Sequence, residues 1–278
     1  MGTELKQRIL SALVLAAIVI YATWMGGFPF RVVAALITIL VYYEWSTITR
    51  LGERDFTGHA FAWLIIGLVA GNILFGDDSM SIPLMGGGVI TAALLTLLRR
   101  SGTWWLPGGI VYAGLSGISL VAIRGDNQAG LVATLFVFAV VWSTDIFAYF
   151  VGRAIGGPKL APRISPGKTW SGAIGGTIAG IIAASALAGV AFSQFAIWTA
   201  AIALVLSIAS QIGDLFESFI KRRFGVKDSS RLIPGHGGVM DRVDGLVFAC
   251  FAAFLLTLAH AALTGHVDES VAAFLFGL

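Results

Sequence analysis

Long hydrophobic stretches recur along the whole chain, separated by short polar segments. Each stretch holds about 20 residues, the length of α-helix that crosses a hydrocarbon core of about 30 Å. The pattern therefore predicts an all-α polytopic membrane protein with about nine transmembrane helices, each end placed to within several residues. The predicted spans are 8–26, 31–49, 57–76, 81–98, 104–124, 129–152, 170–192, 195–220 and 245–265.

The composition supports this class of protein. Hydrophobic residues make up 57% of the 278 and only 12% are charged, whereas soluble domains are usually about a quarter charged. We expect one integral-membrane domain over residues 1–278, with N-terminal helices over about 1–125 and catalytic helices and loops over about 126–265. The first apolar run is too long for a signal-peptide core, so we expect it to remain as a helix.

The positive charges predict the orientation. If the N-terminus is cytoplasmic, 16 of the 18 Lys and Arg residues fall in cytoplasmic segments, and only Arg31 and Arg124 do not. Cytoplasmic loops carry such an excess of Lys and Arg. We therefore expect a cytoplasmic N-terminus, a C-terminus on the opposite side and, in a bacterium, the inner (plasma) membrane. Cations confined to one membrane face also argue against a nucleic-acid partner.

Acidic residues inside the predicted spans point to a polar site. A charge at mid-membrane costs about 3 kcal/mol or more, so it usually faces a bundle interior or a wet cavity. Glu44 lies near a span end, from which its side chain could reach the interface, and a structural role is expected for it; Asp145 is a further candidate site residue. Another four polar residues follow helical spacing and form one stripe down the eighth span: Asp214, Glu217, Ser218 and Lys221.

The segment KDSSRLIPGHGGVMDRVDG, from Lys227 to Gly245, concentrates charge in an otherwise apolar chain. Asp241 and Asp244 share a face where the ninth helix should begin. With Asp214 they could bring three carboxylates together, an oxygen-rich set that suits Mg²⁺. The alternative is that these acids form salt bridges with the neighbouring Arg and Lys.

Two loops offer phosphate-binding chemistry. Glycines around His236 suit a tight turn whose N–H groups approach an anion, although glycine in a loop is often ordinary turn chemistry. The run Ser165 to Thr169 resembles the end of a P-loop, but Pro162 replaces the first glycine and no strand is expected before it, so it is not a Walker A motif. It is a candidate phosphate-binding turn, with a purely topological role as the alternative. The cations available to this turn and the residues before it are Lys159, Arg163 and Lys168.

These motifs together resemble the phosphatidate cytidylyltransferases, also called CDP-diacylglycerol synthases. The signature of that family is matched by Ser218, Lys221, Arg222, Lys227, Asp228, Pro234, His236, Gly237, Gly238, Asp241, Arg242 and Asp244. Asp145 to Tyr149, Gly152-Arg153 and the run 159–169 look like a second block of the family. The chain departs from that pattern at Ser171, where the family commonly has Glu, and at Gly245, where a serine is often found.

The resemblance implies transfer of the cytidylyl group from CTP to phosphatidate at the cytoplasmic face of the membrane, with Mg²⁺ as cofactor. It implies Asp214, Asp241 and Asp244 as metal ligands of Mg²⁺, with a second cation left open, and these with Lys227 as catalytic residues. The substrate-binding residues that it implies are Lys159, Ser165, Lys168, Thr169, Ser218, Lys221, Arg222, Asp228, His236, Gly237, Gly238 and Arg242. The alternatives are an ion-coupled transporter and a phosphotransferase acting on CDP-alcohols. The sequence leaves the oligomeric state open, a homo-oligomer included.

Overall fold

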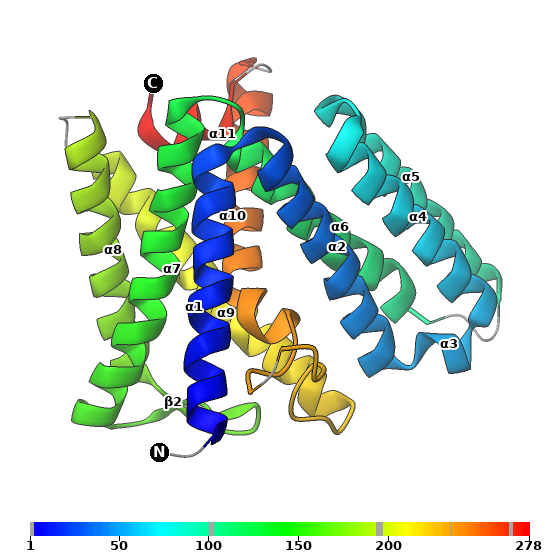
Figure 1. Ribbon diagram of the computed structural model, residues 1–278, viewed down its shortest axis with the longest axis horizontal. Helices are drawn as coiled ribbons and strands as arrows, with labels where there is room; N and C mark the ends of the chain where they lie inside the picture. Colours follow the sequence, from blue (N-terminus) through cyan, green and yellow to red (C-terminus); the bar gives the residue numbers. More distant parts are fainter. Residues whose placement is uncertain (1–2, 100–102, 193–196, 234, 267–268) are drawn as a thin grey trace. The chain divides into compact units, whose positions relative to one another are not determined.

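The computed structural model (Figure 1) describes residues 3–99, 103–192, 197–233, 235–266 and 269–278, and only the backbone of residues 3–9. Within these residues it holds nine long helices, and each coincides with a predicted span. They are α1 (Thr3–Met25), α2 (Gly27–Thr49), α4 (Phe56–Phe75), α5 (Ser81–Leu98), α6 (Trp105–Arg124), α7 (Gln128–Ile155), α8 (Trp170–Phe192), α9 (Ile197–Arg223) and α10 (Met240–Thr264).

The lengths of these helices fit a membrane. In the described part of the chain, eight of the helices are long and apolar enough to cross a bilayer, and α1 adds a shorter apolar stretch, Leu10–Met25. The protein is therefore an all-α polytopic membrane protein, as the hydropathy predicted. Shorter elements complete the fold: α3 (Leu51–Arg54), the 3₁₀ helix η1 (Asp78–Met80), α11 (Val271–Phe276) and the strands β1 (Lys159–Ala161) and β2 (Ser165–Thr169).

The two strands form a hairpin that the sequence did not predict. β1 and β2 pair antiparallel, with Lys159 opposite Thr169 and Ala161 opposite Ser165. The expectation that no strand precedes Ser165 is therefore wrong, because backbone pairing with a later segment stabilises residues of weak strand propensity. Ser165–Thr169 is itself an extended strand that leads into α8, so it does not have the loop conformation of a Walker A motif.

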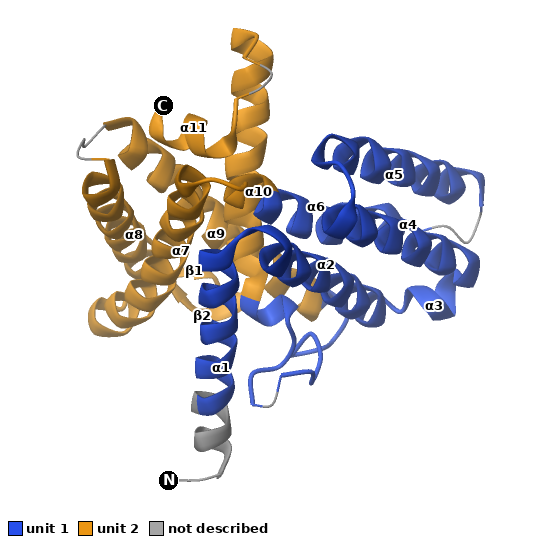
Figure 2. Cartoon of the chain, turned by 45° about the horizontal axis from the view of Figure 1, so that its top comes forward, with its two compact units in different colours: residues 1–121, 223–242 blue, residues 122–222, 243–278 orange. Residues whose placement is uncertain are grey.

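The chain divides into two compact units (Figure 2). Unit 1 comprises Met1–Val121 and Arg223–Arg242, and unit 2 comprises Ala122–Arg222 and Val243–Leu278. The charged segment before α10 thus packs with the N-terminal helices, and α10 itself begins in unit 1 and continues into unit 2.

Unit 1 is built around α2. This helix packs between α1 and α4, and α4 packs in turn on α5. Trp45 of α2 stacks on Tyr112 and donates its indole N–H to the Trp105 carbonyl at 2.8 Å. A Cβ at Gly109 would lie 2.6 Å from the Trp45 ring, so α6 can approach the indole closely only with glycine at that position.

Unit 2 depends on close packing of α7 against α8. Gly172, Gly176 and Gly180 recur every fourth residue and form one buried face of α8. A Cβ at Gly176 would lie 2.5 Å from the Thr144 carbonyl oxygen, and one at Gly172 would lie 2.6 Å from that of Ala148. Small residues at this spacing let two helix backbones approach in lipid, where van der Waals packing drives association.

A ladder of polar side chains joins three helices inside unit 2. Thr144 of α7 lies 2.8 Å from the Ser207 hydroxyl of α9, which donates to Thr177 of α8 at 3.2 Å. Gln211, one turn further along α9, donates to the same Thr177 hydroxyl at 2.9 Å. Thr144 directly precedes Asp145, and Gln211 lies three residues before Asp214. The ladder therefore sets the relative positions of the helices that carry two of the predicted acids.

Candidate active site

Three carboxylates from three helices gather in unit 2. Asp145 of α7, Asp214 of α9 and Asp244 of α10 are close enough that each interacts electrostatically with the other two. From the sequence, Asp145 is only a further candidate site residue. The fold places it with two of the predicted metal ligands, because α7, α9 and α10 belong to the same unit.

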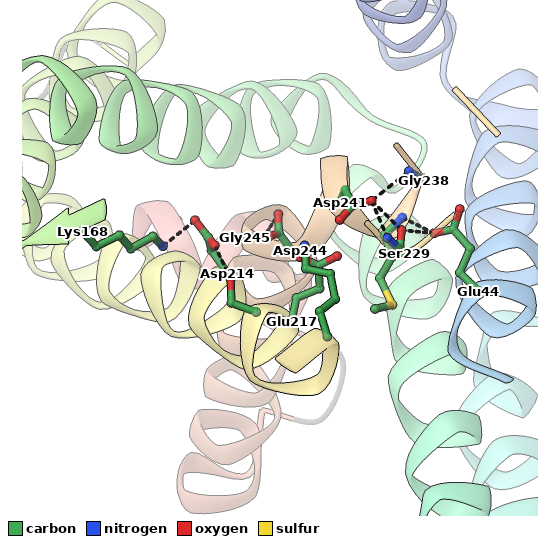
Figure 3. Close-up of polar contacts among 12 residues, drawn as sticks. Glu44, Lys168, Asp214, Glu217, Ser229, Gly238, Asp241, Asp244 and Gly245 are labelled. Carbon is green, nitrogen blue, oxygen red and sulfur yellow. Dashed lines mark hydrogen bonds and ion pairs between the residues drawn. The ribbon is translucent and has the colours of Figure 1, made fainter. Parts of the chain in front are cut away.

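Two lysines lie among these acids. Lys168, at the end of the β-hairpin, forms an ion pair with Asp214 (Figure 3). Lys221 forms an ion pair with the buried Glu217 at 2.6 Å and also interacts electrostatically with Asp244. With Ser218 Oγ 3.5 Å from Asp214 Oδ1, the predicted polar stripe on α9 is confirmed.

Carboxylates outnumber ammonium groups among the contacts described for this cluster. These contacts bring together four carboxylates, Glu217 included, and two ammonium groups. The predicted alternative was salt bridging of the acids by neighbouring Arg and Lys. Ion pairs of this kind are formed by Lys168 with Asp214 and by Lys221 with Glu217.

Two glycines allow α9 and α10 to meet at this point. A Cβ at Gly213 would lie 2.5 Å from the Asp244 carbonyl oxygen, and one at Gly245 would lie 2.8 Å from Ser210 Oγ. The Asp244 carboxylate accepts the Gly245 N–H at 2.9 Å. Ser210 Oγ is buried and has no hydrogen-bond partner among the described residues. The close approach of Ser210 therefore favours glycine at position 245 in this chain.

Asp241 belongs to a different network, in unit 1. Its Oδ2 atom accepts the Ser229 N–H at 2.8 Å, the Ser229 hydroxyl at 2.7 Å and the Gly238 N–H at 2.8 Å (Figure 3). These bonds close the loop in front of α10. The predicted convergence of Asp241 with Asp214 and Asp244 stays a prediction.

Glu44 is part of the same network. Glu44 is fully buried inside the protein, and its contacts give it the structural role that was expected. The carboxylate accepts hydrogen bonds from both hydroxyls of Ser229 and Ser230 and from two N–H groups at the start of α10. Its partners follow it by about 185 residues or more, and no spacing in the sequence indicates this pairing.

The glycine-rich loop is a tight turn. Ile233 and Gly237 form an antiparallel bridge, and Gly237 has a φ of 81°, which favours glycine. Gly238 is required for a different reason, since a Cβ there would lie 2.0 Å from Ser229 Oγ and 2.3 Å from Glu44 Oε1. His236 Nδ1 lies 2.8 Å from the Ser11 hydroxyl of α1. The predicted roles of His236 and both glycines in substrate binding stay predictions.

The other predicted substrate-binding residues lie in both units. Thr169 is buried and its hydroxyl accepts the Gly172 N–H at 3.1 Å, so it caps α8. Ser165 is half-buried in β2. Exposed side chains are Lys159 and Arg222 in unit 2 and Lys227, Asp228 and Arg242 in unit 1. Of the family signature, Pro234 lies outside the described residues.

The described residues contain no group of three or more His, Cys, Asp or Glu side chains arranged to hold a metal ion. Asp145, Asp214 and Asp244 are therefore an electrostatic cluster and not a closed set of ligands. Carboxylate oxygens are nevertheless ligands of the kind that Mg²⁺ prefers.

Comparison with known proteins places the chain in a family. The model of the cytidylyltransferase family matches residues 6–260. The chain belongs to this family. The matched range includes the residues of both the unit 1 network and the acid cluster of unit 2.

Relatives named phosphatidate cytidylyltransferase match this chain over nearly its whole length and theirs. The chain is 46% identical to a phosphatidate cytidylyltransferase of Brucella abortus biovar 1 (strain 9-941) over 255 residues, covering 91% of this chain and 93% of that protein. It is 36% identical to the enzyme of that name from Haemophilus influenzae (88% and 96% covered) and 32% identical to that from Bacillus subtilis (92% and 98% covered). The transporter alternative finds no support in these matches.

Proposed function

We propose that the protein transfers the cytidylyl group of CTP to phosphatidate, giving CDP-diacylglycerol and pyrophosphate. The observation that carries this proposal is the 46% identity to a protein named phosphatidate cytidylyltransferase over 91% of the chain. In the reaction, a phosphate oxygen of phosphatidate bonds to the α-phosphorus of CTP. The bond from that phosphorus to the bridging oxygen of the β-phosphate breaks, and pyrophosphate leaves.

The acid cluster is the proposed centre of this chemistry. Both substrates are polyanions, and added positive charge helps a cluster in which the carboxylates outnumber the ammonium groups to accept them. Asp145, Asp214 and Asp244 offer carboxylate oxygens for Mg²⁺, the cofactor that we propose. When bound, the ion would neutralise phosphate charge and stabilise the departing pyrophosphate.

The lysines of the cluster have a second role in this proposal. Lys168 and Lys221 lie among the acids and present ammonium groups to phosphate oxygens. No strong general base is needed, since the attacking phosphate oxygen of phosphatidate is already ionised at neutral pH. The protein therefore acts mainly by positioning and by electrostatic stabilisation.

The location of the site follows from the same chemistry. The diacyl chains of phosphatidate remain in the bilayer while CTP arrives from water, so the site must open to both. The bias of Lys and Arg supports a cytoplasmic active site and N-terminus. In a bacterium the membrane would be the inner (plasma) membrane.

The direct test is an assay of the purified protein in detergent with radiolabelled CTP, phosphatidate and Mg²⁺. We expect a labelled lipid that co-migrates with CDP-diacylglycerol, formed together with pyrophosphate, and no such lipid when diacylglycerol replaces phosphatidate. Absence of labelled lipid with every divalent cation tried, from protein that remains folded and monodisperse, would refute the proposed function.

A further inference from the structure

Glu44 supplies a helix cap from a distant part of the chain. The first N–H groups of any helix lack partners within the helix. In unit 1, Glu44 Oε1 accepts the Val239 N–H at 2.8 Å and Oε2 accepts the Met240 N–H at 2.6 Å. A negative charge at this end of a helix is also favoured by the helix dipole. The carboxylate of Glu44 in α2 therefore caps the N-terminus of α10.

The same carboxylate holds the loop that precedes α10. Ser230 donates its hydroxyl to Oε1 at 2.6 Å, and Ser229 Oγ lies 3.0 Å from Oε2. Oε1 of Glu44 thus receives one backbone N–H and one hydroxyl, and Oε2 receives one backbone N–H and lies within hydrogen-bond distance of the Ser229 hydroxyl. The arrangement calls for an acceptor at both oxygen positions, which an ionised carboxylate provides and a neutral amide does not.

Ser229 connects Glu44 to Asp241. Its hydroxyl, which has a single proton, lies 2.7 Å from Asp241 Oδ2 as well as 3.0 Å from Glu44 Oε2. Gly238 closes the arrangement, because no side chain fits between Ser229 Oγ and Glu44 Oε1. A displacement of Glu44 would therefore act on Asp241 through one shared hydroxyl.

We propose that Glu44 is a positioning residue for cytidylyl transfer. It fixes the first turn of α10, which carries Asp241 and leads directly to Asp244, and it holds Ser229 and Ser230 of the preceding loop. This inference rests on the proposed function. It adds a residue from α2, outside the signature that resembles the family, to the machinery of the reaction.

The decisive variant is Glu44→Gln, which keeps size and places an amide NH₂ against a backbone N–H or a hydroxyl. We expect kcat to fall about tenfold or more while KM for CTP changes less than about threefold, because the loss affects alignment more than uniform binding. Trypsin should cleave the exposed Arg231 faster than in wild type. The matched control is Glu53→Gln, the same change at an exposed residue of α3, which should behave as wild type.

The outcomes separate this proposal from the proposed function. The proposal would be overturned if Glu44→Gln kept the kcat and the cleavage rate of the wild type. A rise of about tenfold in KM for CTP with unchanged kcat would overturn it as well. If Glu44→Gln does not fold, the deciding variant is Ser230→Ala, which removes one hydrogen-bond donor to Glu44 and keeps the carboxylate. A kcat about threefold lower than that of the wild type would support the proposal. A wild-type kcat would refute it. If the wild type makes no CDP-lipid, the proposed function fails, and the cleavage rates still decide whether Glu44 holds the loop.

Discussion

Lys168 of the β-hairpin and Asp214 of α9 form an ion pair inside unit 2. The contact joins the loop between α7 and α8 to the middle of the acid cluster. It means that the hairpin, which the sequence presented as a separate phosphate-binding turn, belongs to the same site as the carboxylates.

This pairing predicts that the charge of Lys168 matters more than its shape. Lys168→Met should lower kcat/KM for CTP about 100-fold or more, since it removes a cation from a cluster in which the carboxylates outnumber the ammonium groups. Lys168→Arg should retain at least about ten times the activity of Lys168→Met. Steady-state kinetics with detergent-solubilised enzyme would measure both. Equal activity of the two variants would show that activity does not depend on the positive charge at position 168.

The metal proposal predicts a strict need for a divalent cation. Protein stripped with a chelator should form no CDP-lipid, and added Mg²⁺ should restore the rate. In Asp244→Asn the Mg²⁺ concentration for half-maximal activity should rise about tenfold or more, because a ligand of the ion has been lost. The check is a Mg²⁺ titration of initial rates. Full activity of the stripped protein would rule out the cofactor.

Close packing of α7 and α8 predicts different effects of two glycine substitutions on the same helix. Gly176→Leu would force a side chain into the Thr144 backbone and should destabilise the protein by about 1–3 kcal/mol or prevent folding. Gly189→Leu, where nothing lies within 4 Å of an added Cβ, should be tolerated. Thermal unfolding in detergent compares the two. Similar midpoints would contradict the observed packing.

The polar ladder predicts a smaller loss of stability. Gln211→Leu removes the donor to Thr177 and should lower stability by about 0.6–1.7 kcal/mol. Activity should fall as well, because Asp214 lies three residues further along α9. Thr91→Val is the control, since Thr91 Oγ1 donates only to Gly87 of its own helix among the bonds described. Unfolding midpoints that match for wild type and Gln211→Leu would argue against a structural role for the ladder.

Hydropathy was sufficient to predict the nine long helices, because a helix that crosses a bilayer needs about 20 mainly apolar residues, and eight of the nine meet this requirement among the described residues. The stripe from Asp214 to Lys221 was equally accessible, since helical spacing alone places these residues on one face. The hairpin was missed because Pro, Gly, Lys and Ser give weak local signals for a strand, and pairing between two segments stabilises it.

The site itself needed tertiary structure. Asp145 joins Asp214 and Asp244 only because three helices pack in one unit, and no spacing in the sequence expresses that contact. Glu44 is a stronger case, as its partners lie in the loop and helix start near residues 229–240. A buried acid in a span signals that partners exist without saying which they are.

The most direct measurement is the rate of CDP-diacylglycerol formation by Asp145→Asn, Asp214→Asn and Asp244→Asn, with Asp126→Asn, an exposed loop residue, as the matched control. If the three carboxylates form the catalytic cluster, each of the first three variants should lose about 100-fold or more in rate while the control stays near wild type. Wild-type rates in Asp145→Asn and Asp244→Asn would contradict the account.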